Sequence, residues 1–153
     1  MSGFLVEMHG INKAFPSVQA LSDCHFNLKA GEVHALVGEN GAGKSTLMKI
    51  LYGMEHPDSG TILLDGREVT IPNPQAAIRM GIGMVHQHFQ LVPSLTVAEN
   101  VALGYEPRQR GLFVDRARMN RRIAELSEAF GMKVAPDKPV ADQSVGVRQR
   151  VEI

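Results

Sequence analysis

Residues 38–46 read GENGAGKST, and this run matches the phosphate-binding loop pattern G-x-x-x-x-G-K-[ST]. A triphosphate must be met by several converging backbone N–H groups, and glycines let the backbone approach it without side chains in the way. A helix that starts directly after the loop directs its positive N-terminal end at the same anion. The run therefore predicts a P-loop that binds the phosphates of a nucleotide.

Each residue type in the loop has an expected part. Lys44 is expected to place its charge on the β- and γ-phosphates, and the Ser45 hydroxyl to ligate Mg²⁺. The residues expected to bind the nucleotide here are Gly38, Asn40, Gly41, Ala42, Gly43, Lys44, Ser45 and Thr46. The alternative is a glycine-rich turn that happens to contain Lys-Ser, and the elements on either side argue against it.

Strand and helix patterns alternate around the loop. Residues 33–37 form a short apolar run typical of a strand buried on both faces, and residues 44–52 follow as a helix that Gly53 can end. Further strands are expected at 4–11, 20–28, 61–64 (turning at Asp65-Gly66) and 82–85, and further helices after Asn73, Thr96 and Asp115. Strands that alternate with helices predict a parallel α/β core.

The stretch from Thr96 onward carries no strong strand signal, so a helical subdomain is expected there. In its longest helix the side chains expected on one apolar face are Met119, Ile123, Leu126 and Phe130, with Gly131 at the end. The basic cluster at the start of that helix comprises Arg116, Arg118, Arg121 and Arg122. It is either a solvated face or a contact surface for a partner.

Composition excludes several classes of function. The 153 residues carry 16 basic and 16 acidic side chains, so no basic field points to nucleic acid. A single cysteine, Cys24, excludes a disulfide framework and fits a reducing compartment. No apolar run approaches the roughly 20 residues that cross a bilayer, and the first ten residues lack the basic start of a signal peptide. We expect a soluble, cytoplasmic chain.

The run from Glu32 into GENGAGKSTLMKIL resembles the ATPase subunit of ABC transporters, and the resemblance covers essentially the whole chain. It implies an α/β fold: a P-loop NTPase-type core with an N-terminal antiparallel β portion and part of a helical subdomain. The expected division is 1–95 for the ATP-binding core and 96–153 for the helical subdomain. The implied ligands are ATP and Mg²⁺. The implied partners are transmembrane permease subunits, at the cytoplasmic face of the plasma membrane.

Two further segments carry the resemblance. Phe15, in the run 13–16, stands where the family has an aromatic ring that stacks on adenine; the alternative is a core phenylalanine beside a turn. Gln87 resembles the Q-loop glutamine, which can meet Mg²⁺ and the attacking water; the alternative is a polar residue that ends an edge strand. His86 and His88 form an H-x-H pair, for which this loop context is favoured over a metal site.

Residues 143–153 are similar to the ABC signature, L-S-G-G-Q-Q-Q-R. Ser144 and Gly146 match, and in the family this segment meets the γ-phosphate held by the P-loop of a second ABC domain in a head-to-tail dimer. Gln143, Val145 and Val147 depart from the pattern. A valine after the serine occurs in the sugar and nucleoside branch of the family, whereas Gln143 and Val147 put full activity in doubt. The alternative is an ordinary Ser/Gly loop before a helix.

The sequence of residues 86–100, HQHFQLVPSLTVAEN, is similar to the corresponding segment of importer ATPases for nucleosides and simple sugars. The leading hypothesis is an importer ATPase in which ATP binding closes the dimer and hydrolysis reopens it. Two alternatives stay open: a non-transport ABC ATPase that acts on DNA or ribosomes, and a non-catalytic nucleotide-binding fragment. Neutral net charge argues against the first alternative.

An ABC ATPase also needs an apolar strand that ends in Asp-Glu and a later switch histidine, and the 153 residues contain neither. We therefore expect an incomplete ABC ATPase domain whose isolated chain binds nucleotide without turnover. Groups that orient the attacking water are typically worth about 10²–10⁴-fold in rate.

The measurement is phosphate release by the purified chain with Mg-ATP, beside the Lys44→Ala variant, which excludes contaminating ATPases. Turnover that depends on Lys44 and reaches about 1 per second would contradict the expectation.

Overall fold

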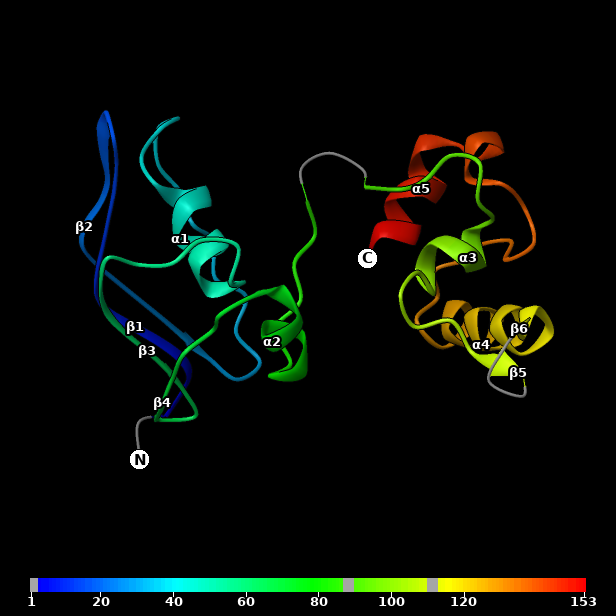
Figure 1. Cartoon of the computed structure of the whole chain (residues 1–153), viewed down its shortest axis with the longest axis horizontal. Helices are drawn as coiled ribbons and strands as arrows, with labels where there is room; N and C mark the ends of the chain where they lie inside the picture. The colour runs from blue at the N-terminus through cyan, green and yellow to red at the C-terminus, as the bar shows by residue number, and fades with distance from the viewer. Residues whose placement is uncertain (1–2, 87–89, 110–112) are drawn as a thin grey trace. The chain divides into compact units, whose positions relative to one another are not determined.

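A computed structural model describes residues 3–86, 90–109 and 113–153 of the chain. The chain forms two compact units, Met1–Met84 and Val85–Ile153 (Figure 1). The predicted functional division at residues 95 and 96 stays a prediction. No helix among the described residues has the length and apolar character needed to cross a membrane.

The first unit is built on a four-stranded antiparallel sheet with the order β2-β1-β3-β4. Its strands are β1 Phe4–Phe15, β2 Val18–Lys29, β3 Ser59–Leu64 and β4 Arg67–Val69. β1 is longer than the predicted strand and carries an irregularity between Met8 and Ile11, where three residues of β1 pass two of β2. Such a bulge restores both residues to the same face, and both are fully buried. The predicted antiparallel β portion is confirmed.

Two short helices, α1 Lys44–Leu51 and α2 Pro74–Arg79, lie beside the sheet (Figure 1). Leu47 and Ile50 of α1 and Ala77 of α2 share one apolar core with the sheet. Asn73 caps α2 by accepting a hydrogen bond from the Ala76 N–H at 2.9 Å, with proline at the first helical position. The predicted start of α2 is confirmed.

α1 ends as predicted, in a left-handed turn at Gly53. The Gly53 N–H donates to the Ile50 carbonyl at 3.0 Å and the Met54 N–H to the Lys49 carbonyl at 2.9 Å, which is the Schellman pattern. Gly53 has φ 74, and a Cβ there would lie 2.8 Å from the carbonyl carbon and oxygen of Asn73. Only glycine fits, because both the backbone conformation and the space exclude a side chain.

Two predicted parallel strands are not strands in the structure. Residues 33–37 and 82–85 make no ladder, and among the described residues no strand lies beside them to pair with. Val33 and Val37 are consequently 99% and 90% exposed. The physical reason is that a parallel strand forms only when neighbouring strands hydrogen-bond to it. The pattern of apolar residues predicts the burial that such neighbours would give, but it does not show that they are there.

The second unit is mainly helical, as predicted, with α3 Val97–Val101, α4 Arg116–Ala129, a 3-10 helix η1 Val140–Asp142 and α5 Val145–Glu152. α3 lies between α4 and α5 (Figure 1). Its core consists of Val97, Ala98, Met119, Ile123, Val140 and Val151. A short hairpin of β5 Arg108–Gln109 and β6 Phe113–Val114 was not predicted, because strands of two residues carry no readable alternation.

The predicted caps of the second unit are present. Thr96 and Glu99 form the capping box of α3, and hydrogen bonds from the backbone and then the side chain of Thr96 hold the pKa of Glu99 below its ordinary value. Asp115 caps α4 through the Arg118 N–H at 2.9 Å. Phe130 lines the same surface pocket as Ile123 and Leu126, although it follows the last helical residue, Ala129, and is 71% exposed.

We expect Gly53→Ala to destabilise the chain more than Gly81→Ala. Both glycines have positive φ, at 74 and 84, so both variants carry the left-handed backbone cost of about 1–2 kcal/mol. Only at Gly53 would the new Cβ meet backbone atoms, since nothing lies within 4 Å at Gly81. The additional cost of forcing a group into packed space is typically about 1–3 kcal/mol.

The measurement is the free energy of unfolding from urea titrations of both variants and the unaltered chain. Equal losses for the two variants would show that the contact with Asn73 is easily relieved.

Candidate functional site

The P-loop occupies the turn between the exposed segment 33–37 and α1. The Ala42 N–H donates to the Glu39 carbonyl at 3.2 Å, and Gly41 and Gly43 have φ 86 and 81. These two left-handed residues fold the backbone into a compact loop that no other residue type adopts as readily. The loop is exposed from Gly38 to Ala42, so its backbone is open to a ligand.

Gly43 joins the loop to the sheet. A Cβ at this position would lie 2.4 Å from the Ala20 carbonyl oxygen and 2.6 Å from Cδ2 of Leu21, both on β2. The loop and the start of α1 therefore sit directly against β2. Gly43 is also the N-cap of α1, where it offers no side-chain hydrogen bond.

The N-termini of α1 and α5 differ from those of the other α-helices in how they are capped. Asn73, Thr96 and Asp115 cap α2, α3 and α4 with side-chain oxygens. α1 and α5 have no side-chain cap and no acidic residue in the first turn. These are the two helices at which the sequence predicts contact with phosphate, and an uncapped N-terminus leaves its N–H groups available to an external anion.

Lys44 lies across the loop. Its Nζ donates to the carbonyl oxygens of Gly38 at 2.7 Å and Glu39 at 2.6 Å. The positive charge is thus held beside the loop backbone by two charge-assisted hydrogen bonds. Ser45 is exposed and Thr46 is half-buried in the first turn of α1, so both hydroxyl residues follow the loop as the motif requires.

Phe15 is placed near the P-loop by the hairpin of β1 and β2. It is the last residue of β1 and pairs with Val18, two residues before the Ala20 carbonyl that touches Gly43. Its side chain is 36% exposed, and Nζ of Lys13 lies over the ring at 5.5 Å from its centroid. The ring is therefore available at the hairpin end, with one face engaged by a cation.

The predicted signature residues lie in the second unit. Ser144 is the N-cap of α5 and is exposed, and Gly146 has open space where a Cβ would stand. Arg148 fixes the preceding loop, because Nε donates to the Gln143 carbonyl at 3.0 Å and Nη2 to the Ala141 carbonyl at 2.8 Å. Sequence reasoning missed this role of Arg148; its only signal was an arginine five residues beyond the loop.

Gln143, which departs from the signature pattern, is turned away from α5. Its side-chain amide donates to the Pro139 carbonyl at 3.1 Å. Gln87 and His88 lie outside the described residues. No group of three or more histidine, cysteine or acidic side chains in the part of the chain that the structure describes could hold a metal ion.

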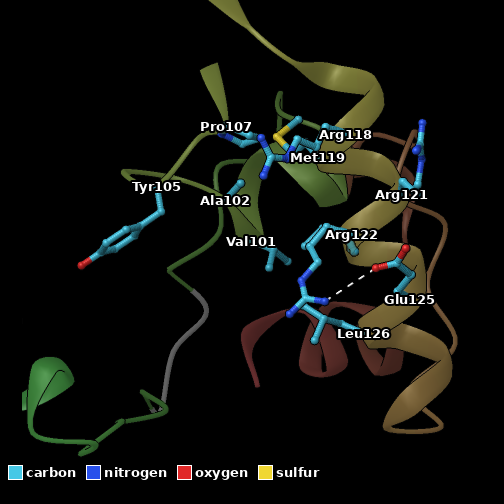
Figure 2. A pocket seen from close by; sticks show the side chains of 11 residues that line it. Val101, Ala102, Tyr105, Pro107, Arg118, Met119, Arg121, Arg122, Glu125 and Leu126 are labelled. Carbon is cyan, nitrogen blue, oxygen red and sulfur yellow. Dashed lines mark ion pairs between the residues drawn. The ribbon is translucent and has the colours of Figure 1, made fainter. Parts of the chain in front are cut away.

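A basic groove opens beside α4 in the second unit (Figure 2). It has a volume of about 570 Å³, and apolar side chains from α3 and α4 line it with three arginines of the predicted basic cluster. The lining includes Val101, Tyr105, Arg118, Met119, Arg121 and Arg122. Arg122 pairs with Glu125 at 3.6 Å, whereas Tyr105 extends outward and is 74% exposed.

Comparison with known proteins gives a consistent set of relatives. The model of the ABC transporter family matches residues 21–153. The chain is 55% identical over 149 residues to the ribose import ATP-binding protein RbsA 1 of Rubrobacter xylanophilus, covering 97% of this chain and 30% of that protein. It is 47% identical over 150 residues to the guanosine import ATP-binding protein NupO of Bacillus subtilis, covering 98% and 29%. The chain thus spans about three tenths of the length of these curated relatives.

Solved structures agree on the fold. CbiO1 from Clostridium perfringens, part of the ABC transporter complex cbiONQ, superimposes with a TM-score of 0.74 at 27% identity, covering 99% of this chain and 60% of that one. A nucleotide-free ATP-binding cassette from an ABC transporter gives a TM-score of 0.78 at 22% identity, covering 97% and 62%. The second likeness shows the fold alone.

We expect Lys44→Ala to weaken ATP binding strongly, because Lys44 brings the fixed positive charge to the loop. Loss of a charge-assisted contact costs roughly 1.5–3 kcal/mol, or about tenfold to over a hundredfold in affinity. The measurement is the dissociation constant from calorimetry. Lys49→Ala, an exposed residue in the last turn of the same helix, is the control and should bind as the unaltered chain does.

Equal ATP affinities of the unaltered chain and Lys44→Ala would contradict the P-loop assignment.

Proposed function

The chain belongs to the ABC transporter family, and we propose that it is the ATP-binding part of an importer subunit for a sugar or a nucleoside. The observation that carries the proposal is the geometry of the P-loop, in which Gly43 seats the loop against β2 and Lys44 lies across it. The transported class follows from the names of the relatives, which import ribose in one case and guanosine in another.

In this proposal the first unit holds Mg-ATP. The loop backbone and the uncapped N-terminus of α1 bind the phosphates, and Lys44 exchanges its carbonyl partners for phosphate oxygens. The Ser45 hydroxyl and Gln87 would hold Mg²⁺, which would neutralise charge on the bound phosphates. Phe15 would stack on the adenine ring, a contact worth roughly 1–3 kcal/mol by analogy with stacking on nucleic-acid bases.

The second unit would serve the nucleotide of another ABC domain. Ser144 and Gly146 stand at the uncapped start of α5, where a hydroxyl and open backbone N–H groups suit an anion. A head-to-tail dimer would bring this segment to the γ-phosphate on the partner's P-loop. Val145, which is 63% exposed, replaces a glycine of the signature pattern at the first helical position of α5.

The basic groove is the proposed contact with a permease at the cytoplasmic face of the membrane. Its apolar lining, with Val101 and Met119, suits a short amphipathic helix, and the surrounding arginines suit acidic groups on that helix. ATP binding and, in the complete protein, hydrolysis would then move the permease. The relatives' names support this partner class, since each is an import ATP-binding protein.

The runner-up is a non-transport ABC ATPase that acts on nucleic acid or ribosomes. The formal net charge of zero argues against it, because such partners select basic surfaces. The relatives' names point the same way.

We expect the tagged chain to capture a permease from detergent-solubilised membranes of the native host, and the double variant Arg118→Glu with Arg121→Glu to reduce the yield several-fold. Charge reversal in the groove repels the acidic groups that the arginines would meet. Arg67→Glu, on β4 of the first unit, is the matched control and should leave the yield unchanged. Capture of ribosomes or nucleic acid without any permease would favour the runner-up.

A further inference from the structure

We propose that Asp58 is a positioning residue for the nucleotide base: its carboxylate fixes the end of β1 and thereby orients the Phe15 ring. The inference rests on the proposed adenine contact of Phe15 and adds to it a residue that the P-loop motif does not contain.

Asp58 contacts three consecutive residues that lead into Phe15. Its Oδ2 accepts a hydrogen bond from the Ala14 N–H at 2.6 Å, and its Oδ1 accepts one from Nζ of Lys13 at 3.2 Å. Its own N–H donates to the Asn12 carbonyl at 2.8 Å. One residue therefore holds a strand end that lies 44 positions earlier in the chain.

The end of β1 needs such support because the sheet does not supply it on both sides. β3 pairs with β1 only as far as Asn12, opposite Ser59, whereas β2 continues to Phe15. On the side of β3 the Ala14 N–H has no strand to donate to, and the Asp58 carboxylate takes the place of a strand carbonyl. The pairing of β1 with β2 also changes register on both sides of Lys13.

Lys13 connects the Asp58 carboxylate to the Phe15 ring itself. Its ammonium group is bound by Asp58 and lies over Phe15, 5.5 Å from the ring centroid. A cation held in this place engages one face of the ring and leaves the other for a base. The Lys13 side chain is 15% exposed, so it is fixed far more than a free surface lysine would be.

The Asp58 carboxylate can keep its contacts with Lys13 and Ala14 at neutral pH. The hydrogen bond from the Ala14 N–H, and then that from Lys13, hold the pKa of Asp58 below its ordinary value. Asp58 therefore stays ionised at neutral pH, and the contacts loosen only as the pH falls through the lowered pKa.

The test compares ATP with inorganic tripolyphosphate, because the second ligand has the phosphates without the base. We expect Phe15→Ala to lower ATP affinity roughly 5- to 150-fold. Asp58→Ala should lower it about 2- to 10-fold, the cost of ordering one side chain at binding. Neither should change the affinity for tripolyphosphate. In the Phe15→Ala background, Asp58→Ala should have no further effect on ATP binding.

Controls and contrary outcomes separate the two assignments. Glu68→Ala, an exposed acid on β4 of the same sheet, should bind both ligands as the unaltered chain does. If Phe15→Ala lowers ATP affinity and Asp58→Ala does not, the positioning role is wrong and the adenine contact stands. If Phe15→Ala has no effect, the adenine contact itself fails. If Asp58→Ala weakens both ligands equally, Asp58 supports the whole unit and the proposal is overturned.

Should Asp58→Ala fail to fold, Asp58→Asn carries the same comparison. It keeps an oxygen for the Ala14 N–H and loses the charge that holds Lys13. Its ATP affinity should fall between those of the unaltered chain and Phe15→Ala, with tripolyphosphate affinity unchanged. Unchanged affinity for ATP in Asp58→Asn together with Phe15-dependent binding would overturn the role of Asp58.

Discussion

The close approach of Gly43 to β2 is the contact on which the proposed nucleotide site depends. The backbone of the loop reaches the Ala20 carbonyl without any side chain between them, and Leu21 packs against the same point. This contact fixes where α1 begins. It also relates the loop to Phe15, because Ala20 lies two residues after Val18, the β2 residue that pairs with Phe15. The proposed phosphate and base contacts would therefore share the β1–β2 hairpin as their support.

Signals that act within a few residues were readable from the sequence. Asn73 with Pro74, Thr96 with Glu99, and Gly53 each satisfy helix ends locally, and each stands where it was expected. Asp65 and Gly66 both have positive φ, at 49 and 71, as a two-residue hairpin turn requires. The residues 33–37 and 82–85 were misassigned because their strand character needs neighbours elsewhere in a sheet, and an apolar run carries no information about whether those neighbours are present.

The same distinction holds for the candidate site. The motif identified Gly43 and Lys44 because loop geometry and charge are encoded in adjacent residues. Asp58 and Arg148 escaped notice, since each acts through contacts that only the fold creates: Asp58 on Lys13 and Ala14, and Arg148 back onto the loop before α5. An isolated acid before a strand or an arginine in a helix predicts a solvated side chain.

The uncapped start of α1 has a thermodynamic consequence. A side-chain cap stabilises a helix by about 0.5–2 kcal/mol relative to alanine but by only a few tenths of a kcal/mol relative to glycine, so Gly43 leaves the start of α1 without a side-chain hydrogen bond at little cost. An anion that binds the free N–H groups supplies stability in its place, by an amount that grows with the logarithm of its concentration. The melting of this part of the sheet-and-helix unit is therefore linked to the chemical potential of its ligand. If the loop binds nucleotide as proposed, local order near it would vary with the nucleotide concentration around the chain.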